Sequence, residues 1–188
     1  MAVPREPQPV KLFLGIIYRE GVDLSILRSR LEEIWGPTDF LSPPCPFDLT
    51  RYYEKEMGLG LKRVFWSFSR LIDPGELASI KVRTNRLEEE FSQEGKRSVN
   101  LDPGYLDFFK IVLASGKFSG QKIYLGQGIY ADPTLYYHRG WKAYDWGFPD
   151  FRGGLYNRVF DRIRDIYKRQ IREKAHSESH SGKGQSPT

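Results

Sequence analysis

An α+β fold is the class that this sequence predicts, and three stretches of the chain support it. Residues 10–18, VKLFLGIIY, form an almost continuous apolar run, which is typical of a strand covered on both faces of its sheet. Residues 24–34 carry leucine and isoleucine at helical spacing, which indicates an amphipathic helix. Residues 63–71, RVFWSFSRL, indicate a second strand that places bulky apolar side chains at alternate positions on one face.

The first helix has clear ends in the sequence. Asp23 can accept hydrogen bonds from the backbone at the helix N-terminus, and Gly36 followed by Pro37 stops the helix. The proline-rich stretch TDFLSPPCPF (38–47) then supports at most a short edge strand, because proline cannot donate a backbone hydrogen bond to a neighbouring strand.

The strongest local signal is DPGEL at residues 73–77. Asp73 is placed to cap a helix, Pro74 occupies the first helical position, and Glu76 completes a capping box. The helix predicted from there ends at Gly95, and a short strand, RSVNL, follows it. The face that this helix presents to the core consists of Leu77, Ile80, Thr84, Leu87 and Phe91.

The order of these elements is βαββαβ, which predicts a ferredoxin-like core. Such a core leaves one face of its sheet bare, but the run at 10–18 is apolar on both faces. We therefore expect the rest of the chain, a C-terminal helix, a β-hairpin and a last helix, to cover the second sheet face.

Each of these covering elements has its own pattern. Asp102-Pro103 repeats the cap signal and predicts a helix that contains Leu106, Phe109 and Leu113. Residues 122–137 read as a hairpin or a bent pair of strands, and a short strand follows at 142–144. The last amphipathic helix is predicted from Leu155, Val159, Ile163 and Ile166.

Length and composition limit the remaining possibilities. We predict one α+β domain over residues 1–174 and a disordered polar tail over 175–188. The only cysteine, Cys45, excludes an internal disulfide and favours a reducing compartment. No apolar run of about 18 residues exists, so no membrane span is expected, and residues 1–9 lack the apolar segment of a signal peptide. The cytoplasm is the expected location, and the oligomeric state stays open.

A long connection, FDLTRYYEKEMG (47–58), points to a ligand site. Hairpin connections usually have two to five residues, so a longer polar one is often functional. In a ferredoxin-like fold this connection lies at the end of the sheet where the fourth strand finishes, near residues 100–105. The candidate ligand-binding residues at this rim are Arg51, Tyr52, Tyr53, Glu54, Glu56, Lys62, Arg63, Asn100 and Asp102.

Mixed acids, bases and tyrosines suit a small anionic ligand, such as a nucleotide or a phosphorylated metabolite. Glu54 or Glu56 is a candidate base, and Lys62 or Arg63 is a candidate group for holding an anion. Structural roles compete with these, because Asp102 also fits a helix cap and the tyrosines also fit packing against the sheet end. A further hypothesis places magnesium, together with a phosphate ligand, on Asp48, Glu54, Glu56 and Asp102.

Several familiar chemistries do not fit. Gly116-Lys117 lacks the glycine five positions earlier and the following serine or threonine of a phosphate-binding loop. Gly126 and Gly128 precede a strand pattern rather than the helix that dinucleotide binding requires. With Cys45 alone and His138 as the only histidine before the tail, no zinc site and no Cys–His nucleophile pair is indicated. No cofactor is identified, and whether the protein is an enzyme stays open.

The last helix supports an alternative function. The formal net charge of the chain is +5, and residues 152–174 alone contain eight Lys or Arg against three acids, a balance of 8 − 3 = +5. A basic stripe of this kind can meet nucleic-acid phosphates or an acidic protein. The stripe consists of Arg158, Arg162, Arg169 and Arg172.

The sequence also resembles a known family. PFDLTRYYEKEMGLGLKRVFWSFSRLIDPGELASIK, NLDPGYLDFFKIVLASGKFSGQKIYLGQGIYADPTLYY and YDWGFPDFR are similar to motifs of domain-of-unknown-function family 4416. The resemblance covers roughly residues 9–167, which is nearly all of the predicted domain. It implies a stand-alone cytosolic protein of prokaryotes. It assigns no activity and no catalytic residue, but two of its motifs coincide with the predicted rim.

Overall fold

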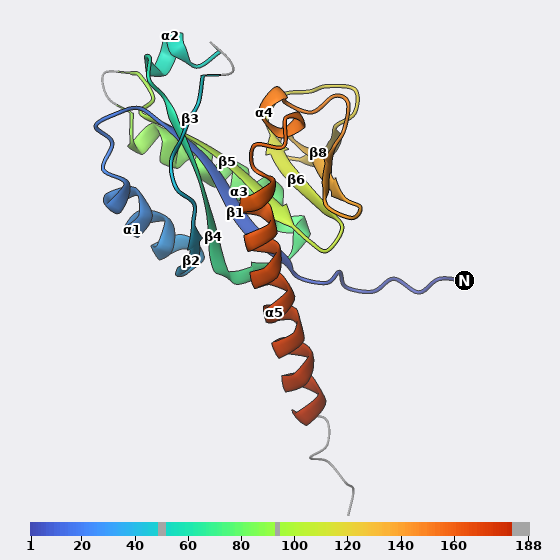
Figure 1. Ribbon diagram of the computed structural model, residues 1–188. Coiled ribbons are helices and arrows are strands. Elements are labelled where there is room, and N and C mark those ends of the chain that lie inside the picture. The colour runs from blue at the N-terminus through green and yellow to red at the C-terminus, as the bar shows by residue number, and fades with distance from the viewer. Residues whose placement is uncertain (49–51, 93–94, 182–188) are drawn as a thin grey trace, which may run out of the picture.

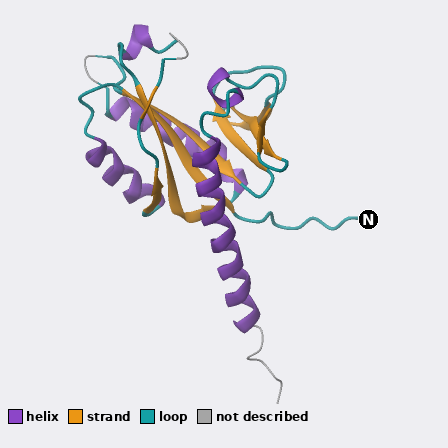
Figure 2. Ribbon diagram, in the orientation of Figure 1, coloured by secondary structure: helices purple, strands orange, loops and turns teal. Residues whose placement is uncertain are grey.

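The computed structural model describes residues 1–48, 52–92 and 95–181. Within these ranges nine strands form one sheet, and helices pack on both of its faces (Figures 1 and 2). Along the main path the strand order is β2-β4-β1-β5-β6-β8-β7, while β3 pairs with β4 and β9 pairs with β8. All of these pairings are antiparallel. The predicted α+β class is confirmed.

The first half of the chain follows the sequence signals closely. The carboxylate of Asp23 accepts a hydrogen bond from the backbone N–H of Ser25 at 2.8 Å, and Asp73 with Glu76 forms the predicted capping box. The elements are β1 (Val10–Tyr18), α1 (Leu24–Trp35), β2 (Thr38–Leu41), β3 (Cys45–Pro46), α2 (Glu54–Met57), β4 (Lys62–Ile72), the 3-10 turn η1 (Pro74–Glu76) and α3 (Leu77–Glu90).

The central strands bury both of their faces, as the apolar run at 10–18 predicts. All nine residues of β1 are buried. On one face, Leu12, Leu14 and Ile16 pack with residues of α1 and α3. On the other face, Phe13 packs against Phe160 of the last helix, with ring centroids 5.3 Å apart. The expectation that the last helix covers the second face is therefore correct, and Figure 1 shows this helix, α5, crossing the sheet.

The helix predicted after Asp102-Pro103 is wrong. The chain instead forms β5 (Val99–Leu106) and β6 (Lys110–Ser115), joined by a turn in which Asp107 accepts hydrogen bonds from the backbone of Phe109 and Lys110. β5 pairs with β1 over eight residues, and this long ladder overrides the local cap signal. Pro103 is tolerated because β6 pairs with β5 only from Gly104 onward, which leaves this part of β5 with one strand neighbour.

The hairpin after β6 extends the sheet rather than covering a face. It consists of β7 (Ile123–Gly126) and β8 (Ile129–Tyr137), and the short β9 (Trp141–Ala143) pairs with β8. The sheet therefore has nine strands in the described ranges instead of the four of the predicted ferredoxin-like core.

The last helices differ from prediction at their ends. α4 spans Pro149–Arg152, and α5 spans Asn157–Ser181. Leu155 precedes α5 and is 54 % exposed, whereas Phe160, Ile163 and Tyr167 form the buried side of the helix. α5 includes residues 175–181, predicted from the sequence to be a disordered tail, because extending an existing helix costs little. Among the helices of the described ranges, none is both long and apolar enough to cross a membrane.

Candidate functional site

A cavity of about 530 Å³ opens where β6 separates from β5. Its walls come from β5, α3, the end of β6, β8, α4 and the segment that contains Tyr52 and Tyr53. This volume lies within the range of small-molecule sites. The charged residues that line it are the cations Arg63, Lys81, Arg97, Lys117 and Lys122 and the carboxylates Glu88, Asp102, Asp132 and Asp150.

The cavity exists because side chains, rather than a strand, bond the outer edge of β5. The ammonium of Lys81 donates to the carbonyl oxygen of Leu101 at 2.8 Å. The backbone N–H of Leu101 donates to the Glu88 carboxylate at 2.7 Å. These two bonds from α3 satisfy backbone groups that a neighbouring strand would otherwise pair. The backbone N–H and carbonyl oxygen of Leu101 therefore stay paired where β6 diverges from β5.

Arg63 of β4 is the most enclosed cation of the cavity. It is 5 % exposed, it pairs with Asp150 of α4, and its guanidinium lies 3.5 Å from the Asp102 carboxylate. Its guanidinium carbon also lies 4.6 Å from the centre of the Phe47 ring, a cation–π distance. The Nε atom is buried and has no hydrogen-bond partner among the described residues. Arg63 thus links β4, α4 and β5 from inside the cavity wall.

Arg97 joins the α2 segment to the cavity wall. It donates two hydrogen bonds to Glu56, at 2.5 and 2.6 Å, and one to Glu88 at 2.7 Å. Hydrogen bonding to Arg97 lowers the pKa of Glu56. Burial raises the pKa of Glu88, although Lys81 and the Leu101 N–H oppose that shift. These charge-assisted bonds hold the segment after Tyr52 and Tyr53 against α3 and the connection that precedes β5.

Asp102 lies at the centre of this wall and is its most accessible carboxylate. Its side chain is 23 % exposed, compared with 5–8 % for the other three lining carboxylates. Asn100 donates to it at 2.9 Å, and Lys81 lies 3.7 Å away. Burial raises the pKa of the neighbouring Tyr53, and the negative charge of Asp102 adds to that effect. Asp102 can therefore accept a hydrogen bond from a ligand hydroxyl or amine.

The opposite side of the cavity carries two lysines in different situations. Lys122 pairs with Asp132 at 3.2 Å and donates to Ser115 at 2.8 Å, and its side chain is 7 % exposed. Lys117 is exposed and donates a hydrogen bond to the hydroxyl of Tyr52. No carboxylate of the described residues forms an ion pair with Lys117, whereas each of the other four lining cations has one. Lys117 is thus the cation that an incoming anion can reach.

The residues predicted from the sequence divide into two groups. Tyr52, Tyr53, Arg63, Asn100 and Asp102 line the same cavity. The predicted end of the sheet is wrong, however. Arg63 and Asn100 both pair with Ile17, near the end of β1, so these residues meet where β5 begins and not where the fourth strand finishes. In an antiparallel sheet β5 runs against β1, which places its first residues beside the last residues of β1.

The other predicted residues lie elsewhere. Glu56 reaches the wall through Arg97, but Glu54 and Lys62 line a separate outer groove, and Lys62 lies 3.9 Å from Glu20. Lys62 precedes Arg63 along a strand, so the two side chains point to opposite faces of the sheet. Arg51 lies outside the described residues.

The carboxylates considered for magnesium are not brought together. Asp48 and Glu54 line the outer groove, Glu56 is bound to Arg97, and Asp102 lies in the cavity. In the described part of the chain, no group of three or more His, Cys, Asp or Glu side chains is arranged to hold a metal ion.

Several lining residues were missed by sequence reasoning. They come from α3, the connection before β5, the β6–β7 connection, β8, and α4 with the residue before it: Lys81, Glu88, Arg97, Lys117, Lys122, Asp132, Phe148 and Asp150. Most were missed because residues 103–115 were assigned to a helix. With β5 and β6 as a hairpin, the register that pairs Gly104 with Leu113 brings Ser115 toward Asp102. The turn signal at Asp107 was the available clue.

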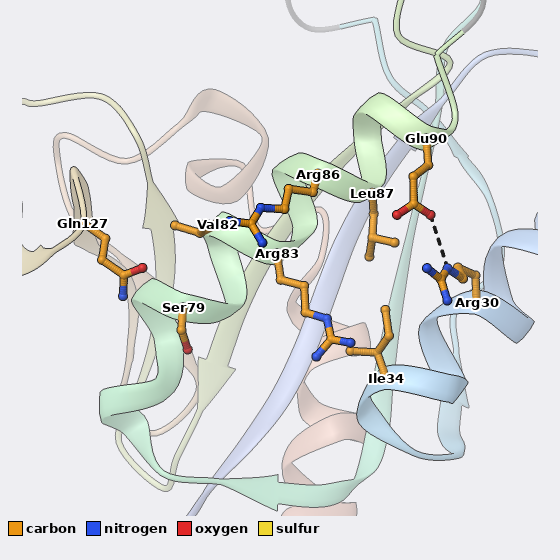
Figure 3. Close-up of a pocket in the computed structure, with 9 residues that line it drawn as sticks. All are labelled: Arg30, Ile34, Ser79, Val82, Arg83, Arg86, Leu87, Glu90 and Gln127. Atoms are coloured by element: carbon orange, nitrogen blue, oxygen red, sulfur yellow. Dashed lines mark hydrogen bonds and ion pairs between the residues drawn. The ribbon is translucent and has the colours of Figure 1, made fainter.

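A second hollow lies between α1 and α3, with a volume of about 490 Å³ (Figure 3). Arg83 reaches across it toward Ile34, and Arg30 pairs with Glu90 at 3.2 Å. Glu90 is its only lining carboxylate among the described residues, and none of the predicted site residues lines it. This hollow is an arginine-rich groove on the helix layer, separate from the cavity beside β5.

Comparison with known proteins identifies the family. The sequence model of a domain of unknown function, DUF4416, matches residues 8–167. The chain belongs to this family. The match begins before β1 and ends within α5, so the cavity of this DUF4416 chain lies inside the matched region. No curated protein and no solved structure matches the chain.

Proposed function

We propose that this DUF4416 protein binds a small anionic ligand, a nucleotide or a phosphorylated metabolite, in the cavity beside β5. The observation that carries the proposal is that Tyr52, Tyr53 and Arg63 line one cavity of about 530 Å³ together with Asn100 and Asp102 of β5. The proposal treats β1 to β5 as a ferredoxin-like unit, in which the order β2-β4-β1-β5 brings these two sets of residues to the same end of the sheet.

The charges of the cavity suggest how such a ligand would bind. Arg63, Lys81, Arg97 and Lys122 are already neutralised by carboxylates of the protein. Lys117 forms no ion pair within the described ranges, although the charge of Glu56 is close enough to interact with it. Lys117 is therefore our candidate for the ligand phosphate or carboxylate. Asp102 is our candidate acceptor for a ligand hydroxyl, because it is the most exposed of the lining carboxylates. The nearby aromatic rings of Tyr52 and Phe148 supply apolar contact area.

A thermal-shift screen against nucleotides and phosphorylated metabolites tests the proposal. A ligand at about 100 times its Kd adds about 2.7 kcal/mol to the free energy of unfolding, which corresponds to about 5–10 °C in Tm for a domain of this size. We expect one class of compound to produce such a shift, and Lys117→Ala to weaken its binding by about tenfold or more.

Lys62→Ala is the matched control. It removes the same kind of exposed cation, but Lys62 lines the outer groove rather than the cavity. We expect it to leave the ligand-induced shift unchanged. If Lys62→Ala and Lys117→Ala weaken binding equally, the anion does not bind in this cavity. If no compound shifts the Tm, the protein does not have the proposed ligand site.

The basic side of α5 supports a second candidate, a nucleic-acid or protein interaction module. Arg158, Arg162, Arg169 and Arg172 are all exposed, and the C-terminal part of α5 projects away from the sheet (Figure 1). Acids are interspersed with them, since Asp165 lies in the same groove as three of the arginines. RNA binding that weakens steeply with salt and falls in Arg162→Ala/Arg169→Ala would favour this candidate.

A further inference from the structure

A side pocket of about 220 Å³ lies beside the main cavity. Lys122, Asp132 and Phe148 line both spaces, so the two are neighbours that meet at these three residues. The other lining residues of the side pocket are Ser119, Gln121, Thr134, Trp146 and Gly147. The side pocket has a different chemistry from the main cavity, because it combines two aromatic rings with uncharged polar groups around one ion pair.

Trp146 is held as a rigid flat surface at this side pocket. Its ring stacks on Tyr144, with centroids 4.8 Å apart and planes 11° apart, and Tyr144 in turn packs on Tyr136 at 5.1 Å. The indole N–H donates to the carbonyl oxygen of Pro133 at 3.3 Å. One ring face and one ring edge are thus fixed by the protein. The side chain is nevertheless 50 % exposed, which leaves the other face able to receive a ligand.

Phe148 supplies a second aromatic ring two residues later. It is 53 % exposed although it lines both spaces. Gly147 makes the close turn between the two rings, and its N–H donates to the carbonyl oxygen of Tyr144 at 2.9 Å. A Cβ atom at this position would lie 3.0 Å from that same oxygen, so a larger residue would strain the turn. The turn therefore presents Trp146 and Phe148 to the same pocket.

Polar groups at the side pocket suit the edge of a heterocyclic ring. The Gln121 side-chain oxygen accepts a hydrogen bond from Ser119 at 2.5 Å. Its amide nitrogen makes no hydrogen bond within the described part of the chain, so it can donate to a ring nitrogen or carbonyl. Thr134 adds a hydroxyl, which donates to the carbonyl oxygen of Asp132 at 2.9 Å and can accept in turn.

We propose that the side pocket holds the planar base of a nucleotide on Trp146, while the sugar and phosphate extend into the main cavity toward Asp102 and Lys117. This inference rests on the proposed function and narrows its ligand class from any phosphorylated metabolite to nucleotides. Stacking on an aromatic ring tolerates different bases, so Gln121 and the pocket shape, rather than the indole, set any preference among bases.

Tryptophan fluorescence reports on this site directly. The chain has four tryptophans, and Trp35, Trp66 and Trp141 are only 4–5 % exposed, whereas Trp146 is 50 % exposed. Titration with the four nucleoside monophosphates should quench the emission of Trp146, because a base stacked on the indole contacts it directly. Ribose 5-phosphate should bind at least about tenfold more weakly and leave the emission unchanged, because it lacks the base.

Variants separate stacking from a general structural effect. Trp146→Ala should weaken nucleotide binding about tenfold, measured by calorimetry, and leave the affinity for ribose 5-phosphate unchanged. Trp146→Phe keeps a flat ring and should stay within about threefold of the wild type. Phe109→Ala is the control, because Phe109 is an aromatic residue that is 71 % exposed and lines neither space. It should bind nucleotides like the wild type.

The failures of the two proposals are distinguishable. If ribose 5-phosphate binds as tightly as the nucleotides, and Trp146→Ala changes neither affinity while Lys117→Ala weakens both, the base pocket is overturned and the anion site stands. If neither nucleotides nor ribose 5-phosphate binds, both proposals fail. If Trp146→Ala does not fold, the Trp146→Phe result and the quenching titration decide between these outcomes.

Discussion

Lys11 offers the sharpest test of how the packing is held together. Its side chain is completely buried in the middle of the molecule. The ammonium pairs with Asp39 and donates to the carbonyl oxygen of Phe68 at 2.6 Å and to the side-chain oxygen of Gln170 at 2.8 Å. One ammonium thus joins β1 to β2, β4 and α5. We expect Lys11→Met, which keeps the length of the side chain, to destabilise the fold strongly.

The magnitude follows from what the substitution leaves behind. Removing one partner of a buried ion pair costs about 3–5 kcal/mol, since the other charge stays buried without compensation. Asp39 is 19 % exposed at its side chain and also accepts from Ser67 at 2.6 Å, which favours the lower end of that range. We therefore expect a loss of about 3 kcal/mol in the free energy of unfolding, or about 6–12 °C in Tm.

Urea denaturation and thermal melting of the single and double variants check this reasoning. Lys11→Met/Asp39→Leu removes both charges, and we expect it to recover about 2 kcal/mol of the loss, because apolar replacement of both members of a buried pair is close to neutral. A loss below about 1 kcal/mol in Lys11→Met would refute the reasoning, and so would a double variant that is no more stable than the single one.

Three further predictions concern the cavity and its wall. Gly104→Ala would place a Cβ atom 2.7 Å from the Phe13 ring and 2.8 Å from the carbonyl oxygen of Val112. We therefore expect the free energy of unfolding, measured by urea denaturation, to fall by about 2 kcal/mol. An unchanged denaturation midpoint would mean that β6 moves away without cost. Hydrogen bonds from Arg97 lower the pKa of Glu56 below its usual 4.5, so the stability from this pair is present above pH 4.5 and is lost as pH falls through the lowered pKa. Thermal melting at pH 7 and pH 3 should therefore show that Tm falls less on acidification in Glu56→Gln than in the wild type. An equal fall in Tm in the two proteins would contradict this. Asp102→Asn should lower the binding affinity for a hydroxyl-bearing ligand by about tenfold, measured by calorimetry. An unchanged affinity would show that the ligand does not reach β5.

The fold could be predicted where local signals and long-range pairing agree, and not where they conflict. Asp73-Pro74 and Asp102-Pro103 look alike in the sequence, but only the first begins a helix. Asp73 is followed by Glu76 and by apolar residues at helical spacing. After Asp102 the apolar residues also fit a strand of period two, since Ile111 and Leu113 pack on one face of β6 while Val112 packs on the other. Pairing of β5 with β1 decided the outcome, and no local pattern encodes that pairing.

The site was partly predictable for the same reason. The approach of Tyr53 and Arg63 to Asn100 and Asp102 follows from the strand order β2-β4-β1-β5, which the order of elements in the sequence suggested. The sequence reasoning placed this approach where the fourth strand finishes, whereas β5 begins there, because it runs antiparallel to β1. The contributions of Lys117, Lys122 and Asp150 depend on where the hairpins after β5 turn back, and this follows from packing rather than from any motif. Alternation along β4 alone would have separated Lys62 from Arg63, because neighbouring residues of a strand face opposite ways.

The charges around the cavity are not explained by stability. Burying an ion pair costs desolvation free energy that the attraction between the two charges barely offsets. A protein with apolar residues of similar size in their place is often as stable or more stable. Four of the five lining cations are nonetheless retained with their carboxylates, next to open space large enough for a ligand. Fixed charges of this kind are useful where a polar ligand must be oriented, because they do not rearrange when it arrives. Lys117 is the lining cation that forms no ion pair with a carboxylate of the described residues, so an anionic ligand would meet this lysine without displacing an existing ion pair.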